Sequence, residues 1–192
     1  MRKQVIVLIL AVILAGVAVY QNRSGNMFDQ KAGTPAKDAA ASQQIEELPK
    51  VGFKAPLFTL KALDGESYSI PHSTGKPVIV NFWASWCGPC RLEAPELVKL
   101  YDKYKGKLEI YAVNMTTQDT AEDARAFADA FGFMFPVLLD DDEKNPVSNR
   151  YRVQAIPTTF FVDKNGLIVD KVTGLTDPQT LESKFKSLAA TK

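Results

Sequence analysis

The sequence predicts an α/β sandwich around a central mixed β-sheet, and three observations lead to this fold class. Strand-like and helix-like segments alternate from residue 49 to residue 192. Residues 78–83 form a short apolar run, which is typical of a strand buried on both faces. Soon after it, apolar residues recur at helical spacing from Cys90 to Tyr104. Alternating segments of this kind pack helices against a sheet.

The first half of this region predicts a hairpin, a buried strand, two helices and a further strand. Asp64-Gly65 lies between strand-like segments 57–60 and 67–70, a pattern typical of a β-hairpin. The apolar positions of the first helix are Leu92, Leu97, Leu100, Tyr101 and Tyr104. A strand is expected over 108–113 and an amphipathic helix over 120–131. The inward positions expected for that helix are Ala124, Phe127, Ala128 and Phe131.

The second half predicts a strand over 135–139, a second hairpin and a terminal helix. Strand-like segments 158–162 and 167–172 flank Asn165-Gly166. Asp177 is expected to cap a helix that runs to Leu188, with Pro178 at its first position. The acidic run 140–143 lacks the ligand spacing and glycine of a calcium loop, so we expect a solvated turn there.

Composition and charge narrow the function classes. The 192 residues are 46% hydrophobic and 23% charged with a net charge of +1, as in a globular protein. Basic and acidic residues balance after Pro49, so no basic face is expected and nucleic-acid binding is not predicted. His72 is the single histidine, and a histidine-based metal site or Ser-His-Asp triad therefore lacks parts. We expect His72 to be a surface residue.

The N-terminal segment predicts export to the membrane. Arg2 and Lys3 precede an apolar run over 5–20, and positive charge before such a run keeps the N-terminus in the cytoplasm. We therefore expect a single-pass signal-anchor over residues 1–22 with the rest of the chain extracytoplasmic. The alternative is a cleaved signal peptide, since Gly16-Val17-Ala18 offers small residues. Both interpretations export the domain.

Two further parts follow the anchor. Residues 23–48 are polar and alanine-rich with few large apolar side chains, which predicts a flexible linker. Residues 49–192 are expected to form one folded domain. The linker would hold that domain near the membrane while leaving it free to reorient.

Cys87 and Cys90 are the only cysteines, and their spacing indicates redox chemistry. A disulfide framework uses several pairs, and a closed zinc site needs four ligands. The pair stands where a strand turns into a helix, and a helix N-terminus favours the thiolate. We therefore expect Cys87 to be the attacking sulfur and Cys90, one turn in and more buried, to resolve the mixed disulfide. Gly88 leaves room for a partner chain, and Pro89 suits a first helical turn.

The motif W-x-x-W-C-G-P-C over residues 83–90 resembles the thioredoxin superfamily. An exported anchor, a hairpin over 57–70, an inserted helix over 120–131 and the pattern Cys90-x-x-Glu93-x-Pro95 resemble more closely the bacterial TlpA/ResA family of membrane-tethered thiol–disulfide oxidoreductases. The resemblance implies a thioredoxin-like three-layer sandwich with an N-terminal hairpin. It implies a cis-proline loop at Ile156-Pro157, opposite the cysteines.

The resemblance also assigns roles to residues around the cysteines. Asn81 stands where cytoplasmic thioredoxins usually carry a buried aspartate, so Glu93, three residues after Cys90, is the expected proton-handling group. An exposed helix glutamate is the alternative. The residues expected to contact the client are Trp86, Gly88, Pro89, Ile156 and Pro157.

The implied function is the reduction of exported disulfides, including those of apocytochrome c, with electrons supplied by a membrane donor. We expect a monomer with no metal and no cofactor beyond the Cys87–Cys90 disulfide. Two departures bear on the client. Gly88 stands where ResA-type proteins often carry an acidic residue, and the G-V-x-G-x-P-E pattern of cytochrome-maturation members is absent at 153–158.

Two other functions share parts of this pattern. A peroxiredoxin-like peroxidase usually has Thr or Ser three residues before its reactive cysteine, where this chain has Ala84. A tethered metal carrier of the copper-chaperone type uses C-x-x-x-C and a distant histidine, whereas this chain has C-x-x-C and its histidine precedes the pair. Both are less consistent with the sequence than the oxidoreductase.

Overall fold

A computed structural model describes residues 46–70 and 75–190, and its architecture confirms the predicted fold class. The expected membrane anchor, most of the expected linker and His72 lie outside the described residues. Within the described part of the chain, no helix combines the length and the apolar character needed to cross a membrane.

The central sheet has five strands in the order β5-β4-β3-β6-β7. Their bounds are β3 (Val78–Trp83), β4 (Glu109–Asn114), β5 (Val137–Leu139), β6 (Thr158–Val162) and β7 (Ile168–Thr173). Strand β3 pairs parallel with β4 and antiparallel with β6, so the sheet is mixed as expected. The predicted hairpins are confirmed: β1 (Phe58–Lys61) pairs antiparallel with β2 (Ser67–Ile70), and β6 with β7.

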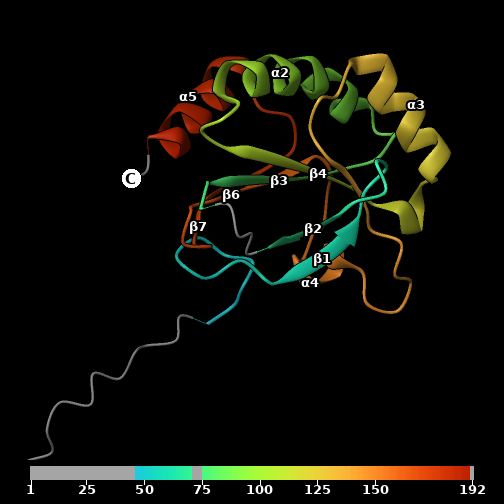
Figure 1. Cartoon of the computed structure of the whole chain (residues 1–192), viewed down its shortest axis with the longest axis horizontal. Helices are drawn as coiled ribbons and strands as arrows, with labels where there is room; N and C mark the ends of the chain where they lie inside the picture. The colour runs from blue at the N-terminus through green and yellow to red at the C-terminus, as the bar shows by residue number, and fades with distance from the viewer. Residues whose placement is uncertain (1–45, 71–74, 191–192) are drawn as a thin grey trace, which may run out of the picture. The chain divides into compact units, whose positions relative to one another are not determined.

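Helices cover one face of this sheet, and the N-terminal hairpin covers the other (Figure 1). The helices α2 (Gly88–Tyr104), α3 (Ala121–Phe131) and α5 (Pro178–Ala189) form the first layer. The β1–β2 hairpin and the short helix α4 (Val147–Arg150) form the third layer. A 3-10 turn, η1 (Thr116–Gln118), joins β4 to α3.

Strand β3 supplies side chains to two hydrophobic cores because successive residues point to opposite faces of a sheet. Ile79 and Trp83 join the core beneath the helices. Val80 and Phe82 join the core beneath the hairpin. All six β3 residues are buried, which confirms the predicted central strand and fixes the position of the loop that follows it.

The helix ends follow local sequence signals. The Thr120 side chain accepts a hydrogen bond from Asp123 N, and the Asp177 side chain accepts one from Thr180 N, so both begin their helices as N-caps. Gly132 ends α3 at φ 69°, a left-handed conformation that costs glycine little. The predicted cap at Asp177 and the first-turn Pro178 are thereby confirmed.

Two local expectations are corrected, and one is confirmed. Leu92 is 69% exposed because α2 packs through its other face, so it is not a core position. Phe131 is partly buried and packs against the core beneath the helices, as its expected inward position requires. The acidic run is solvated over 141–143, as expected, but Asp140 is fully buried. It accepts hydrogen bonds from Val147 N (2.6 Å) and Ser148 N (2.9 Å), which satisfies free N–H groups at the start of α4.

Candidate redox site

The two cysteines lie where β3 ends and α2 begins, and they form a disulfide. Cys87 is the N-cap of α2, with extended backbone angles (φ −78°, ψ 111°). Its sulfur accepts a hydrogen bond from Cys90 N at 3.2 Å. A sulfur in this position faces the free N–H groups and the positive end of the helix dipole, so a thiolate on reduced Cys87 is favoured.

Cys87 and Cys90 do not differ in burial. Cys87 is 3% exposed and Cys90 is 4% exposed, so the expectation that Cys90 is the more buried residue is wrong for this oxidised state. The Cys87 side chain is covered by the loop before β6, where its sulfur lies 3.7 Å from Ile156 O. The N-cap position, rather than exposure, therefore distinguishes Cys87 from Cys90.

The Ile156–Pro157 peptide bond is cis, as the sequence resemblance implied. Pro157 is buried and Ile156 is half-buried beside Cys87. Gly174 N donates a hydrogen bond to Pro157 O at 2.7 Å, which ties this loop to the end of β7. The structure thus brings Ile156 against the disulfide.

Trp86, Gly88 and Pro89 are exposed at the disulfide. Trp86 is 58% exposed, yet its indole Nε1 donates to Gln118 O at 2.9 Å, so the ring is held from one side. A Cβ added at Gly88 would meet no atom within 4 Å, which agrees with the expected room for a partner chain. Contact of these residues with a client stays a prediction.

Glu93 is buried beneath the site rather than exposed on α2, with 3% of its surface accessible. Its Oε2 accepts a hydrogen bond from Asn81 Nδ2 at 3.1 Å, and Oε1 has no partner in the described structure. The same Asn81 Nδ2 donates to Thr159 Oγ1 at 2.9 Å. Burial raises the pKa of Glu93 to about 7, although the bond from Asn81 lowers it. Such a carboxyl can both release and accept a proton near neutral pH.

A second carboxylate near the motif was not foreseen. Asp119, between η1 and α3, accepts hydrogen bonds from Ser85 N (2.6 Å) and Ser85 Oγ (2.7 Å). It also accepts from Asn114 Nδ2 (2.8 Å) and Thr120 N (3.0 Å). Burial acts to raise the pKa of Asp119, but these four bonds together hold it below its usual value. The available signal was an aspartate directly before a helix cap, but its partner Ser85 is 34 residues away.

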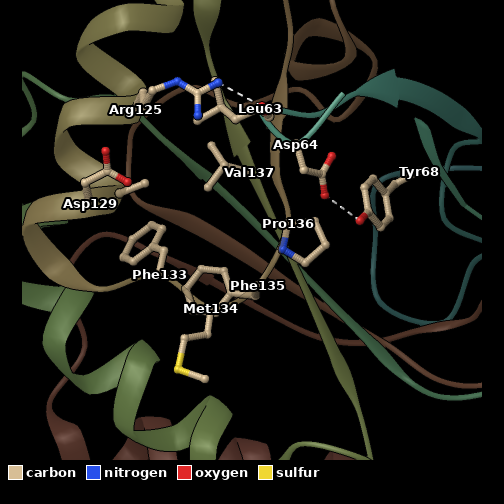
Figure 2. A pocket seen from close by; sticks show the side chains of 11 residues that line it. Leu63, Asp64, Tyr68, Arg125, Asp129, Phe133, Met134, Phe135, Pro136 and Val137 are labelled. Atoms are coloured by element: carbon tan, nitrogen blue, oxygen red, sulfur yellow. Dashed lines mark hydrogen bonds between the residues drawn. The ribbon is translucent and has the colours of Figure 1, made fainter. Parts of the chain in front are cut away.

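The described structure has a surface hollow beside the motif and another away from it. One, of about 450 Å³, borders the motif and is lined by Ser85, Trp86, Arg91, Gln118, Asp119, Thr120 and Asp123. The other, of about 340 Å³, lies between α3, the β1–β2 turn and the segment before β5 (Figure 2). There Arg125 donates to Leu63 O, and Tyr68 donates to Asp64. None of the predicted site residues lines this second hollow.

Metal-ligating groups do not gather anywhere in residues 46–70 and 75–190, where no cluster of three His, Cys, Asp or Glu side chains could hold an ion. The chemistry that this arrangement offers is thiol–disulfide exchange. Its parts are a disulfide at a helix N-terminus, a loop with a cis-proline against it and a buried carboxyl whose pKa is near 7.

Comparison with known proteins agrees with this geometry. The model of the AhpC/TSA family matches residues 51–171. The thioredoxin-like protein YneN of Bacillus subtilis is 42% identical over 135 residues, which cover 70% of this chain and 78% of YneN. The thiol–disulfide oxidoreductase ResA of Bacillus thuringiensis is 35% identical over 144 residues, covering 74% of this chain and 81% of ResA.

Solved structures give the same picture. A Chlorobium tepidum protein described as thiol:disulfide interchange protein DsbE aligns with a TM-score of 0.67 at 33% identity, covering 75% of this chain and all of that one. StoA from Bacillus subtilis aligns with a TM-score of 0.58 at 28% identity, covering 67% of this chain and 96% of StoA. Both alignments cover about two thirds or more of this chain.

Proposed function

We propose that this chain, which belongs to the AhpC/TSA family of thioredoxin-like proteins and is a thiol–disulfide oxidoreductase, reduces disulfides of exported proteins at the outer face of a membrane. The observation that carries the proposal is the Cys87–Cys90 pair at the N-terminus of α2, with Cys87 as N-cap. Apocytochrome c thiols awaiting haem are the client class that the TlpA/ResA resemblance suggests.

The reaction transfers two electrons from the reduced pair to the client. The Cys87 thiolate attacks one sulfur of the client disulfide, the client S–S bond breaks, and a mixed disulfide forms with release of one client thiolate. Cys90 then attacks the Cys87 sulfur, which closes the Cys87–Cys90 disulfide and releases the second client thiolate. Cys90 must lose its proton for this step. The two client thiolates each gain one proton, one of them that of Cys90 and the other from solvent, which took up the Cys87 proton when its thiolate formed.

Glu93 is the proposed acceptor of the Cys90 proton. It is buried on the same helix three residues after Cys90, and its raised pKa of about 7 lets it take and return a proton at neutral pH. Asn81 holds one carboxyl oxygen, and the other oxygen has no partner in the described structure and is free to receive the proton. The client would gain that proton when the site is opened to solvent.

The direction of the reaction rests on the C-G-P-C sequence over 87–90, which resembles reducing thioredoxins more than oxidising enzymes. The place of the reaction rests on the N-terminal sequence. The exterior of the cell favours disulfides, so a reductant there needs electrons delivered through the membrane. The apolar run over 5–20 would anchor the domain within reach of a membrane electron donor. Arg2 and Lys3 before this run support an extracytoplasmic domain.

Equilibrium titration of the full chain against glutathione and dithiothreitol tests the direction. A reduction potential near that of thioredoxin, about −270 mV, supports a reductant, and one near −120 mV, as in strong oxidants, would overturn it. Alkylation of the reduced chain near neutral pH tests the order of attack. Cys87 should be labelled faster than Cys90, and equal or reversed rates would reject Cys87 as nucleophile.

Client identity is tested with a Cys90→Ala chain, which stalls the mixed disulfide on Cys87. Exported proteins with paired cysteines should be trapped on this variant and released by reductant. The matched control is the Cys87→Ala chain, which retains a thiol but lacks the N-cap sulfur and should trap far less. Equal trapping by both variants would contradict the assigned roles.

A further inference from the structure

The loop that leads into Cys87 is held from outside by the loop that follows the neighbouring strand. Strands β3 and β4 are parallel, and Trp83 lies opposite Asn114 at their ends. The two loops therefore begin side by side, at the C-terminal ends of these neighbouring strands. Ser85 and Trp86 lie in the first loop, directly before Cys87, and Asp119 lies in the second.

Asp119 uses both carboxylate oxygens on this contact. Oδ2 accepts from Ser85 N (2.6 Å) and Asn114 Nδ2 (2.8 Å), while Oδ1 accepts from Ser85 Oγ (2.7 Å) and Thr120 N (3.0 Å). Hydrogen bonds to an ionised carboxylate are stronger than those between neutral groups. Two of the four bonds come from Ser85, so this residue is fixed through its backbone and its side chain.

Two further contacts hold the same loop. The Trp86 indole donates to Gln118 O at 2.9 Å, and Arg91 Nη2 donates to Ser85 O at 3.3 Å. The Arg91 guanidinium itself lies over the Phe127 ring, 5.2 Å from its centroid. Residues 85 and 86 are thus tied to η1, to α2 and, through Arg91, to α3.

We propose that Asp119 is a positioning residue for thiol–disulfide exchange, and that it keeps Cys87 at the helix N-cap by fixing Ser85 and Trp86. The inference rests on the proposed role of Cys87 as the attacking sulfur. In the oxidised protein the disulfide itself restrains Cys87. After reduction that restraint is gone, and the loop contacts hold the sulfur where it accepts the Cys90 N–H.

The sign of the effect separates positioning from simple charge. If Asp119 positions the loop, its loss weakens the N-cap contact, destabilises the Cys87 thiolate and shifts the equilibrium toward the disulfide. If Asp119 acts only as a nearby negative charge, its removal favours the thiolate and shifts the equilibrium toward the dithiol. The two roles therefore predict opposite changes.

The experiment compares full-length Asp119→Ala, Ser85→Ala, the double variant and Asp123→Ala with the parent chain. Asp123→Ala is the matched control, since it removes a carboxylate that lies in the first turn of α3, close to Asp119 in the chain. The Asp123 carboxylate bonds Thr120 rather than Ser85. The rate of Cys87 alkylation near neutral pH and the equilibrium constant with glutathione are measured, with thermal unfolding as a check on folding.

Asp119→Ala should slow Cys87 alkylation by about three- to tenfold and shift the glutathione equilibrium toward the disulfide by a similar factor. Ser85→Ala keeps its N–H on Asp119 and should give a smaller change of the same sign. The double variant should match Asp119→Ala alone, because both changes act on one contact. Asp123→Ala should stay within about twofold of the parent.

Parent-like behaviour of Asp119→Ala, a shift toward the dithiol, or an equal shift in Asp123→Ala would each overturn the proposal. Should Asp119→Ala fail to fold, Asp119→Asn and Ser85→Ala give the same comparison with smaller changes. The labelling ratio of Cys87 to Cys90 in the parent chain tests the proposed function by itself. A failure there is thereby distinguished from a failure of the Asp119 inference.

Discussion

Two carboxyl groups lie near the redox motif, and their environments shift their pKa values in opposite directions. Glu93 lies behind the disulfide in a buried cluster with Asn81, and its pKa is raised to about 7. Asp119 lies beside the motif in a partly buried loop, and its pKa is lowered. For both groups burial is the largest influence on the pKa and acts to raise it.

The difference lies in the number of donors directed at each carboxylate. Glu93 accepts one hydrogen bond, from Asn81, and burial outweighs it. Asp119 accepts four, and together they outweigh burial. A buried carboxyl with few donors is suited to exchange protons, and one with many donors stays ionised and holds its neighbours in place. The predictions below test this contrast.

The largest expected effect is a pH-dependent gain in stability in Glu93→Gln. The folded pKa of about 7 exceeds the ordinary 4.5, so between these values the folded state holds a proton that the unfolded state has released. Stability of the parent chain should therefore fall as pH rises through this window. The amide cannot ionise, so Glu93→Gln should be more stable than the parent by up to about 3 kcal/mol at about pH 8.

Urea unfolding of the oxidised chains at about pH 5 and about pH 8 measures this difference. The two chains should be close in stability at the lower pH and diverge at the higher one. Glu96→Gln is the control, since it removes a carboxylate from the same helix that pairs with Lys99 at the surface. A Glu93→Gln chain that keeps the parent's loss of stability with pH would show that Glu93 is not the group responsible.

A smaller effect is expected when the single donor to Glu93 is removed. Asn81→Ala should raise the pKa of Glu93 further, because the remaining influence of burial then acts alone. The loss of this buried bond should also cost about 1–2 kcal/mol of stability. NMR titration of the Glu93 carboxyl carbon measures the pKa directly.

Thr159→Val is the control for that measurement. It removes the hydroxyl that accepts from Asn81 and leaves the Asn81–Glu93 bond in place. The pKa of Glu93 should therefore stay near that of the parent in Thr159→Val and rise only in Asn81→Ala. A lower pKa in Asn81→Ala would mean that Asn81 does not stabilise the ionised carboxylate.

The contrast between the two carboxyl groups also shows what the sequence could predict. The buried strand β3, both hairpins and the Asp177 cap depend on residues near one another in the chain, and these predictions are confirmed. The special place of Glu93 was expected through the resemblance, and its burial agrees with that role. Leu92 was misjudged because it stands five residues before Leu97, about 140° around α2, and so lies off the buried face that Leu97, Leu100 and Tyr104 share.

The Asp119 network could not be predicted from local patterns. Ser85 and Asp119 meet only because β3 and β4 are parallel neighbours in the register that sets Trp83 opposite Asn114. Ser85 is at a variable position of the motif over 83–90, and Asp119 belongs to no motif with a known spacing. Asp140 was missed for a similar reason, since its partners at the start of α4 are seven and eight residues further along the chain.

The smallest expected effect is an acid-dependent loss of stability in Asp119→Asn. The pKa of Asp119 is lowered on folding, so the carboxylate stabilises the folded state above the ordinary aspartate pKa, and this contribution is lost as pH falls through the lower folded value. At about pH 7 the variant should be less stable by about 1 kcal/mol or less, because the site is partly open to solvent. The difference from the parent should shrink as the pH is lowered below about 4. Thermal unfolding across this range, with Asp123→Asn as the control that spares Ser85, measures it. A deficit of constant size down to the lowest pH would show that Asp119 does not stabilise the loop through its charge.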